Sequence, residues 1–264
     1  MDLLPDEVLL DIFDLYLNAE HADAWHTLIH VCQRWRTIVL SSPRRLNLRI
    51  LCKNTRPVRK MLDIWPAFPI VVWHDDPDPF VSVRADDIVA ALEHPNRVRE
   101  IRFKPISTPM LLDVRVAMDV PFSVLTTFEL KLSSTWSPVI PNPFLGGSAP
   151  RLQSLDLDFM CFPSIRKLLL SAKDLVYLSL SFRIYGDNVP PEEIVTCLSS
   201  MARLESISLV LQYDGRDYPC RLSSPLSRAI LPALTYFGFK GAGDYLGVLM
   251  AHLDAPLLDG VTLL

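Results

Sequence analysis

The fold of this chain is decided first in residues 4–13, LPDEVLLDIF, and in residues 31–38, VCQRWRTI. Pro5 suits the first position of a helix, because a proline lacks the N–H group that would be unpaired there. Asp6 and Glu7 would then lie at the positive end of the helix dipole, where carboxylates are favourable. The sequence therefore predicts a helix that begins at Pro5.

Apolar residues fall on more than one side of the helices expected in this stretch. In the first helix Leu9, Ile12 and Phe13 follow helical spacing, whereas Leu10 and Leu15 lie on other faces. The second half repeats this in two stripes, Trp25, Leu28, Ile29 and Cys32, and then Val31, Trp35 and Ile38. So short a segment cannot bury so much apolar surface by itself, which means that the rest of the chain or a partner must cover it.

The stretch from Leu4 to Ile38 resembles the F-box, a helical module of the Skp, cullin and F-box ubiquitin ligases. The resemblance rests on Leu4-Pro5-x-Glu7, on Ile12-Phe13, and on Val31-Cys32-x-x-Trp35-Arg36 with Ile38. It implies three helices that dock on the Skp adaptor, and no break near residue 30 is signalled, since residues 22–41 contain no Gly or Pro. The adaptor contacts it implies are Leu4, Pro5, Leu9, Ile12, Phe13, Val31, Cys32, Trp35 and Ile38. The alternative is that Val31 and Trp35 are core residues facing the downstream domain.

Composition excludes several classes of protein. Half of the 264 residues are apolar, which is typical of a globular chain with a sizeable core. The N-terminus lacks the basic and apolar regions of a signal peptide, and no apolar run could span a membrane, so we expect a cytoplasmic or nuclear protein. The five cysteines form no Cys-x-x-Cys pair, which argues against a structural zinc site and a disulfide framework.

The net charge of −4 conceals an uneven distribution. Residues 1–33 hold seven acidic and no basic side chains, and residues 34–60 hold nine basic and no acidic ones. Such blocks are typical of solvated faces. A weaker hypothesis is that the basic run contacts nucleic acid, but the chain as a whole is acidic, and we expect no nucleic-acid partner.

A repeat follows the N-terminal segment. Residues 46–50 alternate apolar and polar side chains, as a half-buried strand does. Helical stretches are expected at residues 86–92, 164–172, 192–201 and 245–253. The pattern apolar-x-x-apolar-x-apolar then recurs every 23 to 30 residues, starting at Phe68, Val98, Leu125, Leu152, Leu175, Leu204, Leu234 and Leu258.

Residues 46–264 resemble leucine-rich repeats, whose period is similar. Met160, Arg183 and Gln212 replace the Asn that follows the last strand residue in regular repeats, so the expected solenoid is irregular. The expected fold class is α/β: an F-box at residues 1–45, then a solenoid with parallel strands on its concave face at residues 46–264. The pair resembles F-box proteins of fungi, and the last strand has no capping repeat after it, so we expect a C-terminally incomplete solenoid.

Catalytic and cofactor motifs are weak in this sequence. Gly241-x-Gly243-x-x-x-Gly247 has the context of a dinucleotide-binding turn but is one residue too long. His26 and His30 have the spacing of metal ligands, but they belong to the F-box-like segment. Residues 75–79 contain three aspartates without the spacing of a calcium loop. No nucleophile, base and orienting group come together, so we expect neither an enzyme nor a cofactor.

The two halves together predict a non-catalytic substrate receptor of a ubiquitin ligase. The F-box would recruit Skp, and through it cullin and RING subunits, while the repeats hold an unidentified target protein. The alternatives are an interaction scaffold that does not direct ubiquitination and, more weakly, a nucleotide-dependent enzyme. Side chains between the repeat apolars point away from the core. They predict target contacts at Glu100, Arg102, Lys104, Glu129, Lys131, Asp156, Asp158, Tyr177, Ser179 and Ser208.

Overall fold

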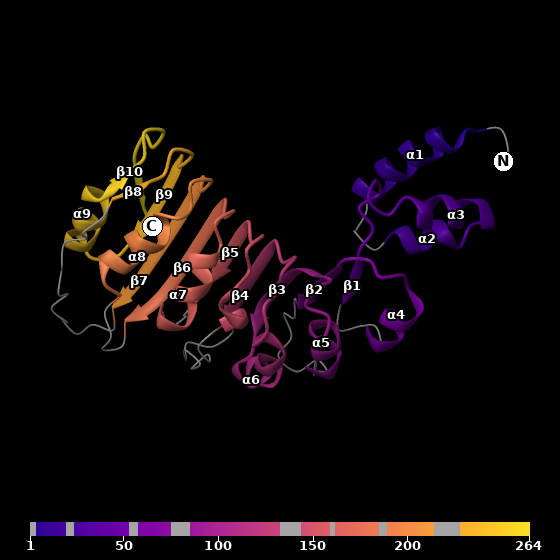
Figure 1. Ribbon diagram of the computed structural model, residues 1–264, viewed down its shortest axis with the longest axis horizontal. Helices are drawn as coiled ribbons and strands as arrows, with labels where there is room; N and C mark the ends of the chain where they lie inside the picture. The colour runs from indigo at the N-terminus through magenta and orange to yellow at the C-terminus, as the bar shows by residue number, and fades with distance from the viewer. Residues whose placement is uncertain are drawn as a thin grey trace.

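The computed structural model describes residues 4–19, 24–52, 58–74, 85–132, 144–158, 162–184, 189–213 and 228–264. Figure 1 shows a mixed α/β molecule with a small group of helices at the N-terminal end and a long sheet that extends away from it. In the described part of the chain, no helix is long and apolar enough to cross a membrane.

The N-terminal helices are α1 (Asp6–Ala19), α2 (Trp25–Ile29) and α3 (Gln33–Ser41). Helix α1 begins one residue later than expected, and the carbonyl of Pro5 accepts the N–H of Leu9. A break between α2 and α3 is present although the sequence signalled none. Cys32 makes it: its backbone is extended, and its Sγ accepts the N–H of Trp35, so a side-chain cap begins α3 without Gly or Pro.

Ion pairs join the acidic and basic blocks of this region. Arg34 forms a 2.7 Å ion pair with Asp6, and Arg45 pairs with Asp11, so both arginines tie the following segment to α1. These four side chains are still 33–69 % exposed, which agrees with the predicted solvated faces, but the pairing between the blocks was not predicted. Residues far apart in sequence cannot reveal such pairing before the helices are placed.

The sheet follows the order of the chain. Among the described residues, nine parallel strands form one sheet in the order β1-β2-β3-β4-β5-β6-β7-β9-β11. A short second sheet pairs β8 (Ala229–Ile230) with β10 (Leu253–Asp254). The strands of the main sheet are β1 (Ile50–Cys52), β2 (Ile70–His74), β3 (Val98–Ile106), β4 (Thr127–Leu132), β5 (Ser154–Leu157), β6 (Tyr177–Ile184), β7 (Ser206–Tyr213), β9 (Tyr236–Lys240) and β11 (Val261–Leu263).

The apolar repeat aligns across this sheet. The middle apolar residues of seven successive repeats pair directly, one strand after another: Ile101, Phe128, Leu155, Leu178, Ile207, Phe237 and Val261. All except Val261 are buried, and they belong to a single hydrophobic cluster that runs from the N-terminal helices to α9. Stacking of equivalent side chains therefore builds the core, as in repeat proteins generally.

Two strand assignments were wrong. In β2, Val72 and His74 pair with Ile101 and Phe103, so the expected core pair Val71 and Trp73 lies on the other face. The apolar run of β2 shows no alternation, and a register shift after Ile70 moves the strand by one residue. The strand expected at residues 46–50 starts only at Ile50, because the chain first passes through a turn in which Asn47 has a φ of 48°.

The helices between the strands lie along one side of the sheet in Figure 1. They are α4 (Val58–Ile64), α5 (Ala85–Leu92), α6 (Thr108–Val114), α7 (Phe162–Ser171), α8 (Pro191–Leu198) and α9 (Gly243–Ala251). Neighbours contact each other, α4 with α5, α5 with α6, α7 with α8 and α8 with α9, so they form one layer. The opposite face of the sheet carries no helix from this layer, and we call it the open face.

Candidate functional site

Helix α1 presents an exposed row of large apolar side chains. Leu4, Val8, Ile12 and Leu15 are 40–71 % exposed, and their spacing places them on one side of α1, where they form what we call the apolar stripe. Val31, in the turn between α2 and α3, is also exposed. Isolated exposed apolar residues are normal, but a contiguous row of this kind marks a surface that a partner covers.

The residues predicted to contact an adaptor divide into two groups. Leu4, Pro5, Ile12, Val31 and Cys32 are exposed, and Trp35 is half-buried with its ring 4.8 Å from that of Phe13. The prediction of direct contact needs a correction for Leu9, Phe13 and Ile38, because all three are buried in the core of the chain. Helical spacing shows that α1 has two apolar faces but not which one turns inward, and the exposure of Val8 and Leu15 was not predicted for that reason.

A buried aromatic junction fixes the N-terminal helices against the sheet. The Trp25 indole donates its Nε1–H to the carbonyl of Arg49 at 2.8 Å. Its ring contacts those of Trp65 and Phe68 edge-on, at centroid distances of 5.1 and 5.6 Å. The apolar stripe is therefore held in a defined direction relative to the open face.

The open face carries the predicted target-binding residues. Register pairs place Arg102 beside Glu129, Glu129 beside Asp156, Asp156 beside Ser179, and Ser179 beside Ser208. One contact was not foreseen: the Trp73 ring lies under the guanidinium of Arg102, with the centroid 5.9 Å from Cζ. The misplaced register of β2 concealed it.

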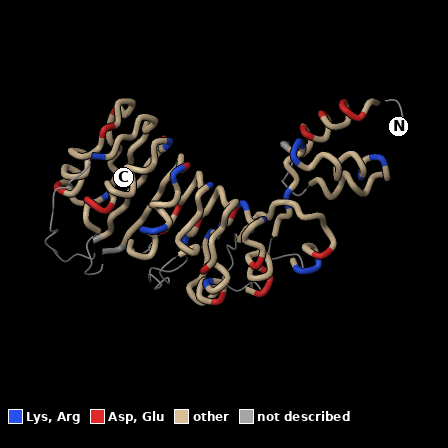
Figure 2. The backbone as a smooth tube through the Cα atoms, in the orientation of Figure 1, with Lys and Arg blue, Asp and Glu red and all other residues tan. Residues whose placement is uncertain are grey.

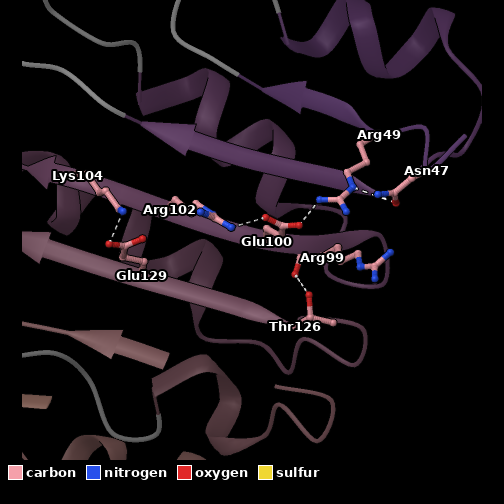
Figure 3. A network of polar contacts seen from close by, with 8 residues as sticks. All are labelled: Asn47, Arg49, Arg99, Glu100, Arg102, Lys104, Thr126 and Glu129. Atoms are coloured by element: carbon pink, nitrogen blue, oxygen red, sulfur yellow. Dashed lines mark hydrogen bonds and ion pairs between the residues drawn. The ribbon is translucent and has the colours of Figure 1, made fainter. Parts of the chain in front are cut away.

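Ion pairs link the charged side chains of the open face, as Figure 3 shows for its first strands. Glu100 pairs with Arg49 and, at 3.0 Å, with Arg102. Glu129 lies 2.6 Å from Lys104, and Lys131 lies 3.1 Å from Asp156. Glu100 and Glu129 are only 8 % exposed, so their predicted role in target contact is corrected to holding the cations in place.

The charge balance changes at β5. Lys131 lies between Glu129, Asp156 and Asp158, and although burial lowers its pKa, the hydrogen bond and charge of Asp156 outweigh this and the pKa is raised overall. Burial raises the pKa of Asp158, against the influence of Lys131. Within the described residues, the buried Oδ1 of Asp156 has no hydrogen-bond partner. Lys131 also lies 3.9 Å from Glu129, so among the described side chains here three carboxylates face the two ammonium groups of Lys104 and Lys131.

Beyond β5 the described side chains of the open face are mostly uncharged, although Lys240 of β9 lies on the same face as Tyr236. Tyr177 pairs with Ser206, which pairs with Tyr236, and both tyrosines are partly exposed. Figure 2 shows basic and acidic positions along the whole length of the molecule, including the part beyond β5. A ligand that crosses the open face would meet paired charges, then surplus carboxylates, then mainly hydroxyl groups, with Lys240 on β9.

The weaker hypotheses gain little from the structure. An added Cβ at Gly243 or Gly247 would meet no protein atom within 4 Å, and at Gly241 it would meet the Phe239 ring, so packing within the chain requires a glycine only at Gly241. In the part of the chain that the structure describes, no three His, Cys, Asp or Glu side chains gather as metal ligands would. The aspartates at residues 75–78 lie outside the described residues.

The comparison with protein families points to the N-terminal region. The F-box-like family model matches residues 1–49. This F-box-like domain contains α1, α2, α3 and the exposed apolar stripe. No curated protein matches the chain. The domain indicates a role in protein–protein interaction, since F-box domains are typically non-catalytic modules that bind Skp-type adaptors.

Proposed function

We propose that this chain is a substrate-recognition subunit of a Skp, cullin and F-box ubiquitin ligase. In this proposal residues 1–45 bind a Skp-type adaptor, and residues 46–264 form an irregular leucine-rich-repeat-like solenoid that binds a target protein. The observation that carries it is an exposed apolar stripe within an F-box-like domain that is fixed to a sheet with an open polar face.

The adaptor side rests on surface chemistry. Leu4, Val8, Ile12 and Val31 would be buried in the interface, and burying apolar area contributes roughly 25 cal/mol per Å². Arg34 stiffens this surface, since it donates to the carbonyl of Leu4 and to Asp6, and so holds the start of α1 against α3. The buried Leu9 and Phe13 support the same helix from inside.

The target side rests on charge. Arg49, Arg102 and Lys104 already have carboxylate partners, whereas among the described side chains Asp156 and Asp158 both depend on Lys131, which also lies near Glu129. A target segment with Lys or Arg would complete this cluster, and neighbouring Tyr177 and Ser179 offer hydroxyl groups to its backbone. The favoured target is thus a basic protein segment, and its affinity falls as salt rises.

Affinity purification followed by mass spectrometry tests both sides together. Intact chain is compared with a Leu4→Ala/Pro5→Ala form in cells treated with a proteasome inhibitor. The proposal expects the adaptor and cullin to disappear from the variant while the target remains bound. If intact chain brings down no Skp-type adaptor, the ligase function is wrong. If it brings down both partners but the lifetime of the target does not depend on the chain, the protein is a scaffold.

A further inference from the structure

A second polar feature lies where several strands of the sheet begin, apart from the ion pairs of the open face. It is a pocket of about 370 Å³ at the N-terminal ends of β3, β4 and β5, and we call it the rim pocket. Arg97, Arg99 and Arg151 line it, together with Asn96, Thr126 and the apolar Val124. No Asp or Glu occurs among the described residues that line it.

A register shift between β2 and β3 leaves Arg99 without a partner in the strand pairing. The pairing of β2 with β3 passes from Ile70–Val98 to Val71–Glu100, so Arg99 is the extra residue of a bulge. Bulges commonly re-aim a side chain beside a functional site. The hydroxyl of Thr126 donates to the carbonyl of Arg99 and so ties the start of β3 to the residue just before β4. In Figure 3 the guanidinium of Arg99 points away from the ion-pair network.

Charge pairing separates the rim pocket from the open face. Arg49, Arg102, Lys104 and Lys131 all form ion pairs across the strands. Within the described part of the chain, the side chains of Arg99 and Arg151 form no ion pair and donate no hydrogen bond. The rim pocket therefore concentrates positive charge that the protein itself does not neutralise.

Arg97 forms the wall of the pocket nearest the N-terminal helices. Its guanidinium donates to the carbonyl of Phe68 from Nε and from one terminal nitrogen, at 3.3 and 3.2 Å. The Phe68 ring contacts Trp25, so this wall continues into the aromatic junction. Burial lowers the pKa of Arg97, and a bound anion would oppose that shift.

We propose that the rim pocket binds the phosphoryl group of a phosphate ester. The arginine guanidinium presents a planar fork of donors that matches phosphate oxygens, and a phosphate monoester carries close to two negative charges at neutral pH. The Asn96 amide lies in the same lining and supplies an uncharged donor, while the Thr126 hydroxyl already donates to the carbonyl of Arg99. At about 370 Å³ the pocket falls in the size range of small-ligand sites, so it has room for the group that carries the phosphate. This inference does not depend on the proposed function.

Calorimetric titration of the full chain tests the proposal with three probes. They are O-phosphoserine, inorganic phosphate and serine, each at low ionic strength. Phosphoserine should bind and serine should not. If inorganic phosphate binds as tightly as phosphoserine, the pocket recognises the phosphoryl group of any small phosphate. If phosphoserine binds more tightly, it recognises a phosphorylated side chain.

Charge-removing variants locate the site. Arg99→Gln and Arg151→Gln should each weaken phosphoserine binding about tenfold, the factor that loss of one charge-assisted hydrogen bond worth roughly 1.4 kcal/mol gives. Arg115→Gln, at an exposed arginine outside the pocket, should leave binding unchanged. Adaptor binding should survive in all three variants, which separates this proposal from the proposed function. Failure of phosphoserine to bind, or equal binding by the Arg99→Gln/Arg151→Gln double variant, would overturn it.

Discussion

The apolar stripe of α1 and the open face of the sheet expose opposite chemistry. The stripe consists of Leu4, Val8, Ile12 and Leu15, which are 40–71 % exposed. On the open face, the acids Glu100 and Glu129 are nearly buried, and each is paired with cations. The stripe exposes apolar surface until a partner covers it, while most charged side chains of the open face already have ion-pair partners.

This difference predicts how binding at each surface should depend on salt concentration. Burial of apolar area is insensitive to moderate salt, so adaptor binding should persist as ionic strength rises. Contacts to Asp156 and Asp158 are electrostatic, and a Debye length of about 8 Å at physiological ionic strength weakens them. Measured at low and high salt, the affinity for the target should fall more steeply than the affinity for the adaptor.

The largest effect is expected from a charge placed within the apolar stripe. Ile12→Lys should weaken adaptor binding by on the order of 2–4 kcal/mol, the cost of disrupting an interface anchor, because it buries a lysine in a dry interface. Surface plasmon resonance with a Skp-type adaptor measures the change. Ile64→Lys is the matched control, since Ile64 is 70 % exposed on α4 outside the F-box-like domain. Similar losses for both variants would contradict the assignment of the stripe.

The second effect concerns the paired charges of the open face. Glu129→Gln removes the acid between Lys104 and Lys131 and should destabilise the fold by roughly 1–2 kcal/mol, less than for a fully buried pair because both lysines are partly exposed. Urea unfolding measures the change. Glu93→Gln breaks the exposed pair with Arg59 and should cost less than about 0.5 kcal/mol. A cost for Glu129→Gln no greater than for Glu93→Gln would show that the network is not structural.

A smaller effect of opposite sign is expected at Asp158. Burial raises its pKa above 3.8, so the charged carboxylate opposes folding, and this penalty is present above the raised pKa and vanishes as the group is protonated at lower pH. Asp158→Asn should therefore raise stability slightly near pH 7, by less than about 1 kcal/mol, and not near pH 3. It should also weaken binding of a basic target.

Thermal unfolding at the two pH values checks the Asp158→Asn prediction. Asp174→Asn, at an exposed carboxylate paired with Arg203, serves as the control. Lower stability of Asp158→Asn at pH 7 would mean that the Asp158 carboxylate stabilises the fold. Asp158→Asn is preferred to Asp158→Lys, because a lysine at this position would lie next to Lys131 and add like-charge repulsion.

The smallest expected effect is a difference in alkylation rate between an exposed cysteine and two buried ones. Cys32 is exposed beside Val31, whereas burial raises the pKa of Cys52 to about 12 and that of Cys197 to about 11. Iodoacetamide at pH 8 should modify Cys32 and leave the other two unreacted, because the thiolate is the reactive form. Bound adaptor should slow the reaction at Cys32. Peptide mass spectrometry reads all three sites, and equal reaction with and without adaptor would place Cys32 outside the interface.

Pattern predicted the sheet far better than it predicted the surfaces. The pairing from Ile101 to Val261 could be foreseen because each strand alternates core and open-face residues. In β2 apolar residues occupy both faces, so alternation could not show that Val72 faces the core. Cys32 could not be recognised as a helix cap, since caps are usually Ser, Thr, Asp or Asn.

The ion pairs of the open face and the rim pocket could not be predicted from the sequence, and the reason is a different one. Arg49 meets Glu100, and Arg99 lies near Arg151, only because parallel strands bring distant turns to one edge. The acids of the open face were foreseen as exposed contacts, but packing buries Glu100 and Glu129. Periodicity gives the face on which a side chain lies, whereas its exposure depends on the length and charge of its neighbours.

Hydrogen–deuterium exchange of the full chain, with and without a Skp-type adaptor, tests the central claim most directly. The account predicts slower exchange in residues 4–15 and 30–36, which surround the apolar stripe, and unchanged exchange in β3, β4, β5 and β6. The open face would then stay free for a target while the adaptor is bound. Protection of those strands by the adaptor, or no protection of residues 4–15, would contradict the division of the molecule into an adaptor surface and a target surface.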